Sequence, residues 1–278
     1  MIGFFFRESN ARSVAASKKL KKLLSGSGLV HRDLEEDECT VENCADIDLL
    51  IVFGGDGSVL RAAKIALSRI PIVAINTGNV GFLTSYEESD LETLVSDIKN
   101  DNLKFSKRKL MKVTCGDKTY YALNDVTVTK NYHIDDASEC VKLHLKIDGE
   151  FVDTYVADGM VIATPTGSTA YALSAGGPII TPRVSAFVAT PICAHSLHSR
   201  PIVFSEKAKT SVTVDKRTKE CVLYIDGAAT APVPCGGTVF VERSDIAVNI
   251  CEFAQNFFNK LSTKLNIWST TDVTKETE

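Results

Sequence analysis

The chain has 278 residues, of which 44% are hydrophobic and 24% are charged, a balance typical of a globular protein with a sizeable core. Its formal net charge of −4 argues against a general binder of nucleic acid or acidic membranes, because such proteins present a basic surface. No segment has the ~18 to 20 apolar residues that a membrane-spanning helix needs.

The eight cysteines form no Cys-x-x-Cys pair, and their spacing matches no usual zinc site. In a chain of this length, free thiols in a reducing compartment are favoured over a disulfide framework. The apolar run near the N-terminus is too short for the core of a secretion signal. We therefore expect a cytoplasmic protein.

Strand and helix patterns alternate through the first hundred residues. Strands are predicted at residues 2–6, 48–53 and 71–76, and helices at residues 13–24, 58–67 and 89–100. Ser89 and Glu92 have the spacing of a capping box at the start of the third helix. Continuous apolar strands between helices predict an α/β domain over residues 1–102, with a parallel sheet and helices on both sides.

The pattern changes after about Asn102. Val141, Leu143, Leu145 and Ile147 alternate with polar residues up to an Asp-Gly turn at residues 148–149, which predicts a hairpin. Two further extended runs follow at residues 210–215 and 220–227. A second, mostly antiparallel β domain is therefore expected over residues 103–250.

The chain is expected to end with a helix over residues 251–268 that returns to pack on the first domain. Phe253, Phe257, Leu261 and Leu265 lie four apart, a helical spacing. The polar residues 269–278 are expected to form a disordered tail.

A Gly-Gly-Asp-Gly turn, residues 54–57, follows the second predicted strand. Ligands of open α/β sheets bind outside the carboxyl ends of strands, and glycines let backbone N–H groups approach phosphate oxygens. Asp56 could accept a proton from an attacking hydroxyl or bind Mg²⁺. A carboxylate that caps the following helix in a tight turn is an equally good interpretation of these four residues.

Further polar segments stand at the ends of predicted strands. Residues 163–180 combine glycines with many hydroxyls, which suits a polar ligand that has a ring to stack. Asp158 precedes this segment, where it could bind ribose hydroxyls or simply form a turn with Gly159. The loop at residues 78–85 presents Phe82, either to a ligand or to the core.

Three other short features carry polar side chains that could belong to a site. Asn124 and Asp125 interrupt an apolar run and need partners if they are buried. Asp226 precedes a glycine, and locally a hairpin turn is its better interpretation. His195 and His198 lack supporting ligands, so we expect no metal site built from protein side chains.

Taken together, the motifs resemble the NAD kinase family. They are, in chain order, GGDGSVLRAA, NTGNVGFLT, LNDV, ADGMVIATPTGSTAYALSAGGPI and HSLHSRPIV. The resemblance covers residues 48–226, and the long fourth motif separates this family from the diacylglycerol, sphingosine and 6-phosphofructo kinases that share Gly-Gly-Asp-Gly. It implies transfer of the ATP γ-phosphoryl group to the 2′-hydroxyl of the adenosine ribose of NAD. It also implies a divalent cation, usually Mg²⁺, and a homodimer or homotetramer.

Matched motif by motif, the resemblance makes Asp56 the catalytic base. The other positions that it assigns to substrate binding are Gly57, Arg61, Phe82, Asn124, Asp125, Asp158, Thr169, Ala170, Tyr171, Ser174 and Asp226. Many members have glutamate where this chain has Asp125, and some have arginine where it has Val156.

Two other functions compete with this interpretation. Another Gly-Gly-Asp-Gly kinase, acting on a lipid or a sugar, would lack the dinucleotide pocket around residues 169–174. A dinucleotide-binding regulator without catalysis would keep that pocket but tolerate the loss of Asp56.

Overall fold

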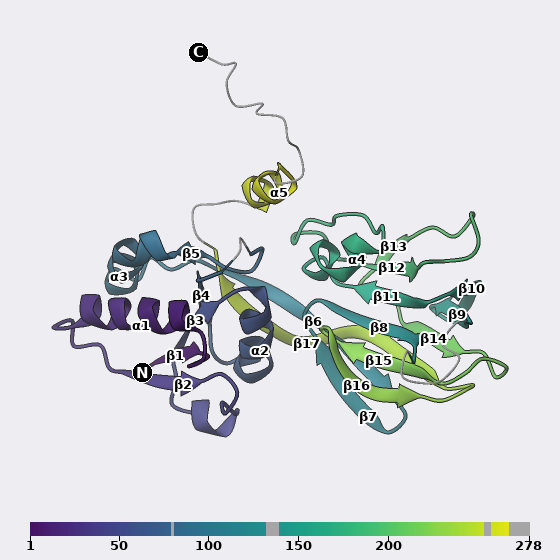
Figure 1. Cartoon of the computed structure of the whole chain (residues 1–278), viewed down its shortest axis with the longest axis horizontal. Helices are drawn as coiled ribbons and strands as arrows, with labels where there is room; N and C mark the ends of the chain where they lie inside the picture. Colours follow the sequence, from purple (N-terminus) through teal and green to yellow (C-terminus); the bar gives the residue numbers. More distant parts are fainter. Residues whose placement is uncertain (79–80, 132–138, 253–256, 267–278) are drawn as a thin grey trace, which may run out of the picture. The chain divides into compact units, whose positions relative to one another are not determined.

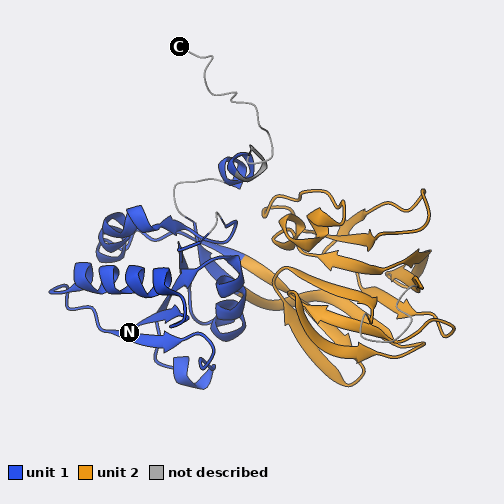
Figure 2. Cartoon of the chain, viewed as in Figure 1, with its two compact units in different colours: residues 1–107, 248–278 blue, residues 108–247 orange. Residues whose placement is uncertain are grey.

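The computed structural model describes residues 1–78, 81–131, 139–252 and 257–266. The chain divides into two compact units (Figure 2): unit 1 contains Met1–Lys107 and Val248–Glu278, and unit 2 contains Arg108–Ala247.

Unit 1 is built on a parallel sheet (Figure 1). Its strands are β1 (Ile2–Phe6), β2 (His31–Glu35), β3 (Leu49–Gly54), β4 (Ile72–Asn76) and β5 (Tyr86–Glu87). The order is β2-β1-β3-β4, and both β5 and the end of β17 (Thr238–Cys251) pair in parallel with β4. Every residue of β1 and β4 is buried, as expected of strands covered on both faces.

Three helices follow strands of this sheet: α1 (Ala11–Leu24), α2 (Asp56–Ala66) and α3 (Leu91–Lys99). Leu20 of α1 and Leu94 of α3 pack with Phe4 and Phe53 in one buried cluster. The predicted α/β fold is confirmed. The capping box at Ser89 is wrong, because α3 begins only at Leu91.

A 3-10 turn, Glu88–Asp90, precedes α3, and another, Glu42–Cys44, follows β2. The N–H of Glu87 donates to the Asp90 carboxylate at 2.9 Å. The capping box therefore lies two residues earlier than the sequence predicted, on the 3-10 turn, where the acidic run Glu87-Glu88 offered a competing start.

Unit 2 contains two groups of antiparallel strands. One has the order β13-β12-β11-β8-β15-β16. Its members are β8 (Asp125–Lys130), β11 (Gly159–Ala163), β12 (Ala186–Ile192), β13 (Ile202–Ser205), β15 (Cys221–Ile225) and β16 (Ala228–Val233). The other is formed by β6 (Phe105–Cys115), β7 (Lys118–Ala122), β9 (Val141–Ile147), β10 (Glu150–Ala157), β14 (Thr210–Val214) and β17.

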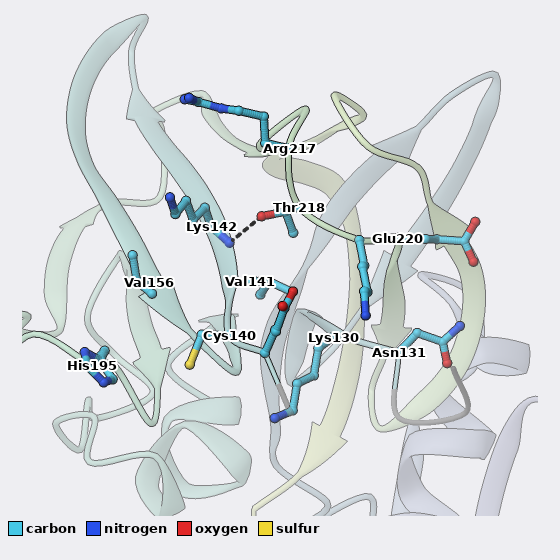
Figure 3. A pocket seen from close by; sticks show the side chains of 12 residues that line it. Lys130, Asn131, Cys140, Val141, Lys142, Val156, His195, Arg217, Thr218 and Glu220 are labelled. Carbon is cyan, nitrogen blue, oxygen red and sulfur yellow. Dashed lines mark hydrogen bonds between the residues drawn. The ribbon is translucent and has the colours of Figure 1, made fainter. Parts of the chain in front are cut away.

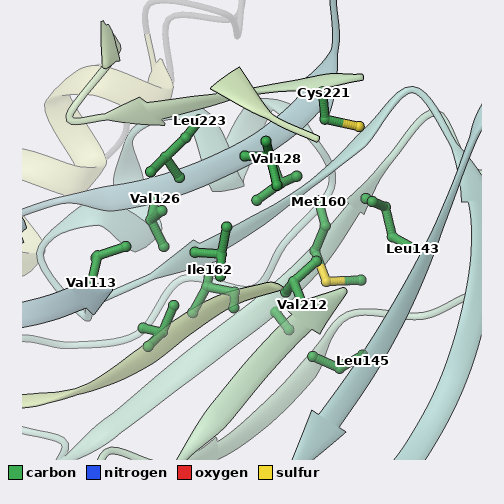
Figure 4. Packing of buried hydrophobic residues seen from close by; sticks show 14 of the residues in the cluster. Val113, Val126, Val128, Leu143, Leu145, Met160, Ile162, Val212, Cys221 and Leu223 are labelled. Carbon is green, nitrogen blue, oxygen red and sulfur yellow. The ribbon is translucent and has the colours of Figure 1, made fainter. Parts of the chain in front are cut away.

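Apolar side chains from both groups of strands meet in one core (Figure 4). Val126 of β8 and Ile162 of β11 share a buried cluster with Leu143 of β9 and Val212 of β14. The hairpin predicted at residues 148–149 joins β9 to β10, and both turn residues have positive φ, as a two-residue hairpin turn requires. The mostly antiparallel second domain is thus confirmed.

The predicted C-terminal helix is wrong at its start, because Cys251 is the last residue of β17. Ile250 pairs in parallel with Ile72 of β4, so this apolar run is a sheet strand, which local spacing alone does not distinguish from a buried helix. Helix α5 runs over Phe257–Asn266. Phe253 and the predicted tail lie outside the described residues. No helix among the described residues is long and apolar enough to cross a bilayer.

Candidate active site

The Gly-Gly-Asp-Gly turn joins β3 to α2 in unit 1. Gly55 is the N-cap of α2, and Asp56 is its first residue. At Gly54, a Cβ atom would lie 2.3 Å from the Ser58 hydroxyl oxygen, so only glycine fits there. Gly57 is exposed in the first turn of α2, and the start of a helix offers backbone N–H groups and positive partial charge to an anion.

The Asp56 carboxylate is held by the loop that follows β4. The N–H of Phe82 donates to Oδ2 of Asp56 at 2.9 Å, and the N–H of Leu83 donates to Oδ1 at 2.9 Å. A Cβ atom on Gly81 would lie 2.3 Å from Oδ1 of Asp56. The two motifs GGDG and GFLT therefore form one arrangement in which the second orients the acid of the first.

Arg61 lies one turn after Asp56 and is exposed. Its guanidinium Nε forms an ion pair with Glu36, whose side chain is only 1% exposed, and Nη2 of Arg7 lies 3.3 Å from the same carboxylate oxygen. Glu36 therefore anchors the guanidinium groups of two arginines, and Arg7 also pairs with Asp37 at 2.9 Å. The sequence did not single out Glu36, which stands in an acidic run and carries no motif.

Phe82 is half-buried, and its ring lies 6.0 Å from that of Phe257 of α5. Lys260 of the same helix donates from Nζ to the carbonyl oxygen of Phe82 at 3.3 Å and to that of Thr84. The aromatic ring that the sequence offered either to a ligand or to the core therefore packs against α5.

In unit 2, Asp226 supports the strand start at Asn124 and Asp125. Its carboxylate accepts from the backbone N–H groups of Leu123, Asn124 and Asp125 at 3.1, 2.7 and 3.3 Å. Asp226 and Gly227 have φ values of 49° and 77° and connect β15 to β16. The hairpin-turn interpretation of Asp226 is thus confirmed, and the structure also places its carboxylate beside Asn124.

Asp125 is buried, and its environment disfavours ionisation. Burial, together with the negative charge of Asp226, raises the pKa of the Asp125 carboxyl from 3.8 to about 7. The side-chain oxygen of Asn124 is also buried and has no hydrogen-bond partner in the described part of the chain. A buried acceptor without a partner is costly, so a donor from a bound ligand would relieve it.

Several hydroxyl groups of the segment after β11 form hydrogen bonds to the protein backbone. The Thr164 hydroxyl donates to Leu123 O at 2.6 Å, and buried Ser168 bonds both backbone groups of Ile180 at 2.9 and 3.1 Å. A Cβ atom on Gly167 would lie 2.0 Å from Asn124 O. This close approach brings the segment against the Asn124–Asp125 strand start.

The residues of this segment that are predicted to contact the ligand come directly after Gly167 in the chain. Thr169 ends a 3-10 turn (Gly167–Thr169) and donates to Thr166 O at 3.2 Å, while Ala170 precedes the short helix α4 (Tyr171–Ser174). Tyr171, which is 46% exposed, and Ser174 face solvent. Because both side chains are exposed, they can contact a ligand.

Asp158 directly precedes β11 and so lies at the opposite end of this strand from the hydroxyl-rich segment. Nζ of Lys130 lies 2.7 Å from its carboxylate. Beside this pair is a pocket of about 390 Å³, lined among others by Lys130, Val156 and His195 (Figure 3). Sequence reasoning missed Lys130, because a lysine at the end of a strand is usually a solvated edge residue.

No group of three or more histidine, cysteine or acidic side chains that could hold a metal ion occurs among the described residues. Each unit thus carries a set of predicted site residues: Asp56, Gly57, Arg61 and Phe82 in unit 1, and the remaining eight in unit 2.

Comparison with known proteins shows to which family the chain belongs. The ATP-NAD kinase N-terminal domain matches residues 4–103, and the ATP-NAD kinase C-terminal domain matches residues 123–253. The chain belongs to the NAD kinase family. Family membership confirms the resemblance drawn from the motifs and disfavours both the lipid or sugar kinase and the non-catalytic regulator.

Curated relatives agree. The NAD kinase of Bacteroides fragilis is 32% identical over 270 residues, which cover 94% of this chain and 90% of the relative. That of Heliobacterium modesticaldum is 36% identical over 221 residues, 77% of each chain, and that of Koribacter versatilis is 39% identical over 224 residues, 78% of this chain and 77% of the relative. This member of the family is therefore an enzyme that phosphorylates NAD.

Two solved structures share the fold. Yeast NADH kinase complexed with NADH has a TM-score of 0.86 and 21% identity, with 99% of this chain and 90% of the other covered. An NAD kinase from Archaeoglobus fulgidus in complex with ATP has a TM-score of 0.76 and 25% identity, with 98% and 100% covered. Membership of the family also implies a kinase that depends on a divalent metal ion.

Proposed function

We propose that Asp56 is the general base of the NAD kinase reaction, in which the γ-phosphoryl group of ATP is transferred to the 2′-hydroxyl of the adenosine ribose of NAD. The observation that carries this proposal is the pair of 2.9 Å bonds from the Phe82 and Leu83 N–H groups to the Asp56 carboxylate. A carboxylate has about four acceptor sites, so a carboxylate oriented by two N–H groups can still accept a hydroxyl proton.

The position of Asp56 supports the same role. It is the first residue of a helix that follows a glycine turn, where anionic phosphates are favoured by backbone N–H groups and the helix dipole. Gly57 and Arg61 would contact those phosphates. A ribose hydroxyl is a weak nucleophile at neutral pH, and a positioned base accelerates its attack by ~10²- to 10⁴-fold.

In unit 2, we assign NAD binding to the residues that cluster around the start of β8 and the segment after β11. The unpartnered oxygen of Asn124 and the buried Asp125 would bind ribose and adenine groups, with Asp226 beside them. Asp158 would bind the nicotinamide side. Thr169, Ala170, Tyr171 and Ser174 would line the dinucleotide pocket, and Phe82 would flank the adenine.

The divalent cation is proposed to be Mg²⁺ bound chiefly through the ATP phosphates. Mg²⁺ in kinases is usually held by one or two carboxylates together with substrate phosphates, which fits a chain whose described residues contain no group of three metal-ligating side chains. Asp56 is the carboxylate on the phosphate-binding turn. When bound, Mg²⁺ neutralises charge on the transferred group.

We further propose a cytoplasmic homodimer or homotetramer. All eight cysteines are free thiols, which suits a reducing compartment. Leu197 is 86% exposed and Val203 of β13 is 50% exposed, and we propose these large apolar side chains as candidates for a contact between subunits. Light scattering coupled to size-exclusion chromatography measures the oligomeric state.

The catalytic proposal is tested with purified protein, NAD, ATP and Mg²⁺, with NADP measured by an NADP-specific dehydrogenase. Asp56→Asn keeps the shape of the side chain and removes the base, so NADP formation is expected to fall by ~10²- to 10⁴-fold. Asp117→Asn is the matched control, because Asp117 is exposed in the turn between β6 and β7. Undiminished NADP formation by Asp56→Asn would refute base catalysis by this residue.

A further inference from the structure

Helix α5 contacts the loop that orients Asp56. Nζ of Lys260 donates to the carbonyl oxygens of Phe82 and Thr84, and the ring of Phe257 lies 6.0 Å from that of Phe82. Phe257 and Lys260 are three residues apart, so they share one face of the helix. In the sequence, Lys260 is 178 positions away from Phe82 and 176 positions away from Thr84.

One peptide group connects Lys260 to Asp56. The carbonyl of Phe82 and the N–H of Leu83 belong to the same planar trans peptide, so they point in opposite directions. That N–H donates to Oδ1 of Asp56 at 2.9 Å, and that carbonyl accepts from Nζ of Lys260 at 3.3 Å. An ammonium group at the carbonyl polarises the peptide and strengthens the hydrogen bond that its N–H makes to the carboxylate.

The loop of residues 82–84 is largely shielded from water, which strengthens hydrogen bonds from Lys260 to its carbonyl groups. Leu83 and Thr84 are buried, and buried carbonyl groups need partners. Lys260 is half-buried, whereas Phe258 and Asn259 of the same helix are exposed. The amphipathic helix therefore presents its cation and one aromatic ring to the loop and turns its other described side chains in this turn to solvent.

We propose that α5 is part of the catalytic machinery, with Lys260 and Phe257 as positioning residues that hold the loop of residues 82–84 and, through it, the Asp56 carboxylate. This inference rests on the proposed role of Asp56 as the base. It assigns to the C-terminal helix a role in the rate of phosphoryl transfer.

The test replaces Lys260 with methionine, which keeps the apolar stem and removes the donors. Because misplaced catalytic groups lower rates steeply, kcat is expected to fall by about 10- to 100-fold, with the KM values for NAD and ATP changed by less than about threefold. Lys260→Arg keeps a cation with several donors and should restore most of kcat. Lys64→Met, on the exposed face of α2, is the matched control and should leave kcat unchanged.

The aromatic contact is tested in the same way. Phe257→Ala should lower kcat, whereas Phe258→Ala, which truncates a ring that is 63% exposed, should have a much smaller effect. Rates are normalised to the concentration of NAD-binding enzyme, measured by calorimetric stoichiometry, so that unfolded protein does not count as slow protein.

A double-mutant cycle separates positioning from general destabilisation. If Lys260 acts through Asp56, Lys260→Met should cause no further loss of NADP formation in the Asp56→Asn background. An equal loss in both backgrounds, or a normal kcat for Lys260→Met, would overturn the inference while the role of Asp56 stands. Full activity of Asp56→Asn would instead overturn the role of Asp56 itself.

Discussion

The Asp125 carboxyl should make the free energy of unfolding of this NAD kinase depend on pH. The substitution Asp125→Asn should remove this dependence. The pKa of its carboxyl is raised from 3.8 to about 7 by burial and by the charge of Asp226. The folded protein therefore holds this proton more tightly than the unfolded chain does. The resulting stabilisation is fully present below the unfolded pKa and is lost as pH rises through 7.

The size of the effect follows from the shift of about three pKa units. Each unit corresponds to about 1.4 kcal/mol, so the free energy of unfolding should lose about 4 kcal/mol from this group across the whole titration. Between pH 5 and pH 8 the loss should be about 3 kcal/mol, because part of the titration between the unfolded and folded pKa values takes place below pH 5.

The assay is urea unfolding of the wild type and of Asp125→Asn at pH 5, 6, 7 and 8. Asparagine has the same shape and does not ionise, so the variant should gain about 3 kcal/mol relative to the wild type over this range. Asp117→Asn, at an exposed turn, should follow the wild type. Parallel pH profiles for the wild type and Asp125→Asn would show that the Asp125 carboxyl titrates alike in the folded and unfolded states.

Three further outcomes are expected. Gly167→Ala should lower the free energy of unfolding by about 3 kcal/mol in urea titrations, because its Cβ would lie 2.0 Å from Asn124 O. Lys130→Met should lower it by about 1 kcal/mol and raise KM for NAD, because the Asp158 carboxylate loses a cation at 2.7 Å; Lys130→Arg should restore both. Removal of divalent cations with EDTA should abolish NADP formation, and added Mg²⁺ should restore it.

The fold was predictable wherever the pattern of apolar residues was long and regular. Continuous runs such as residues 2–6 became buried parallel strands, and the alternation before Asp148 became one arm of a hairpin. The C-terminal run was misassigned at Cys251 because a short apolar segment suits a strand or a helix equally. The preceding residue, Ile250, pairs with Ile72, which is far away in the sequence.

The chemistry was predictable where a motif is contiguous, and less so where the site depends on distant partners. The turn alone was enough to suggest Asp56 as the base, which stays a prediction, but nothing local indicates that Glu36 pairs with Arg61 or that Lys260 contacts the loop at Phe82. Such contacts join residues whose sequence neighbours carry no shared pattern. They are determined by the packing of helices and strands onto each other.

The hydroxyl-rich motif shows a different limit of sequence reasoning. Its density of serine and threonine suggested contacts to a ligand, yet Thr164 and Ser168 bond the backbone of their own segment. The sequence does not divide hydroxyls between folding and binding, because both uses require the same small polar side chains. Tyr171 and Ser174 are exposed, so these members of the motif can reach a ligand.

Two aspartates in this chain accept backbone N–H groups in a similar way, but their surroundings suit them to different roles. Asp56 and Asp226 each follow a strand, stand next to glycine and accept backbone N–H groups from a distant loop. Asp226 lies in a hairpin turn with positive φ and receives three consecutive N–H groups, which suits a side chain that fixes the backbone of Asn124 and Asp125. Asp56 begins a helix beside an exposed glycine, where phosphates can approach. The surroundings of each carboxylate, rather than the shared Asp-Gly dipeptide, therefore distinguish the proposed base from the residue that supports the start of β8.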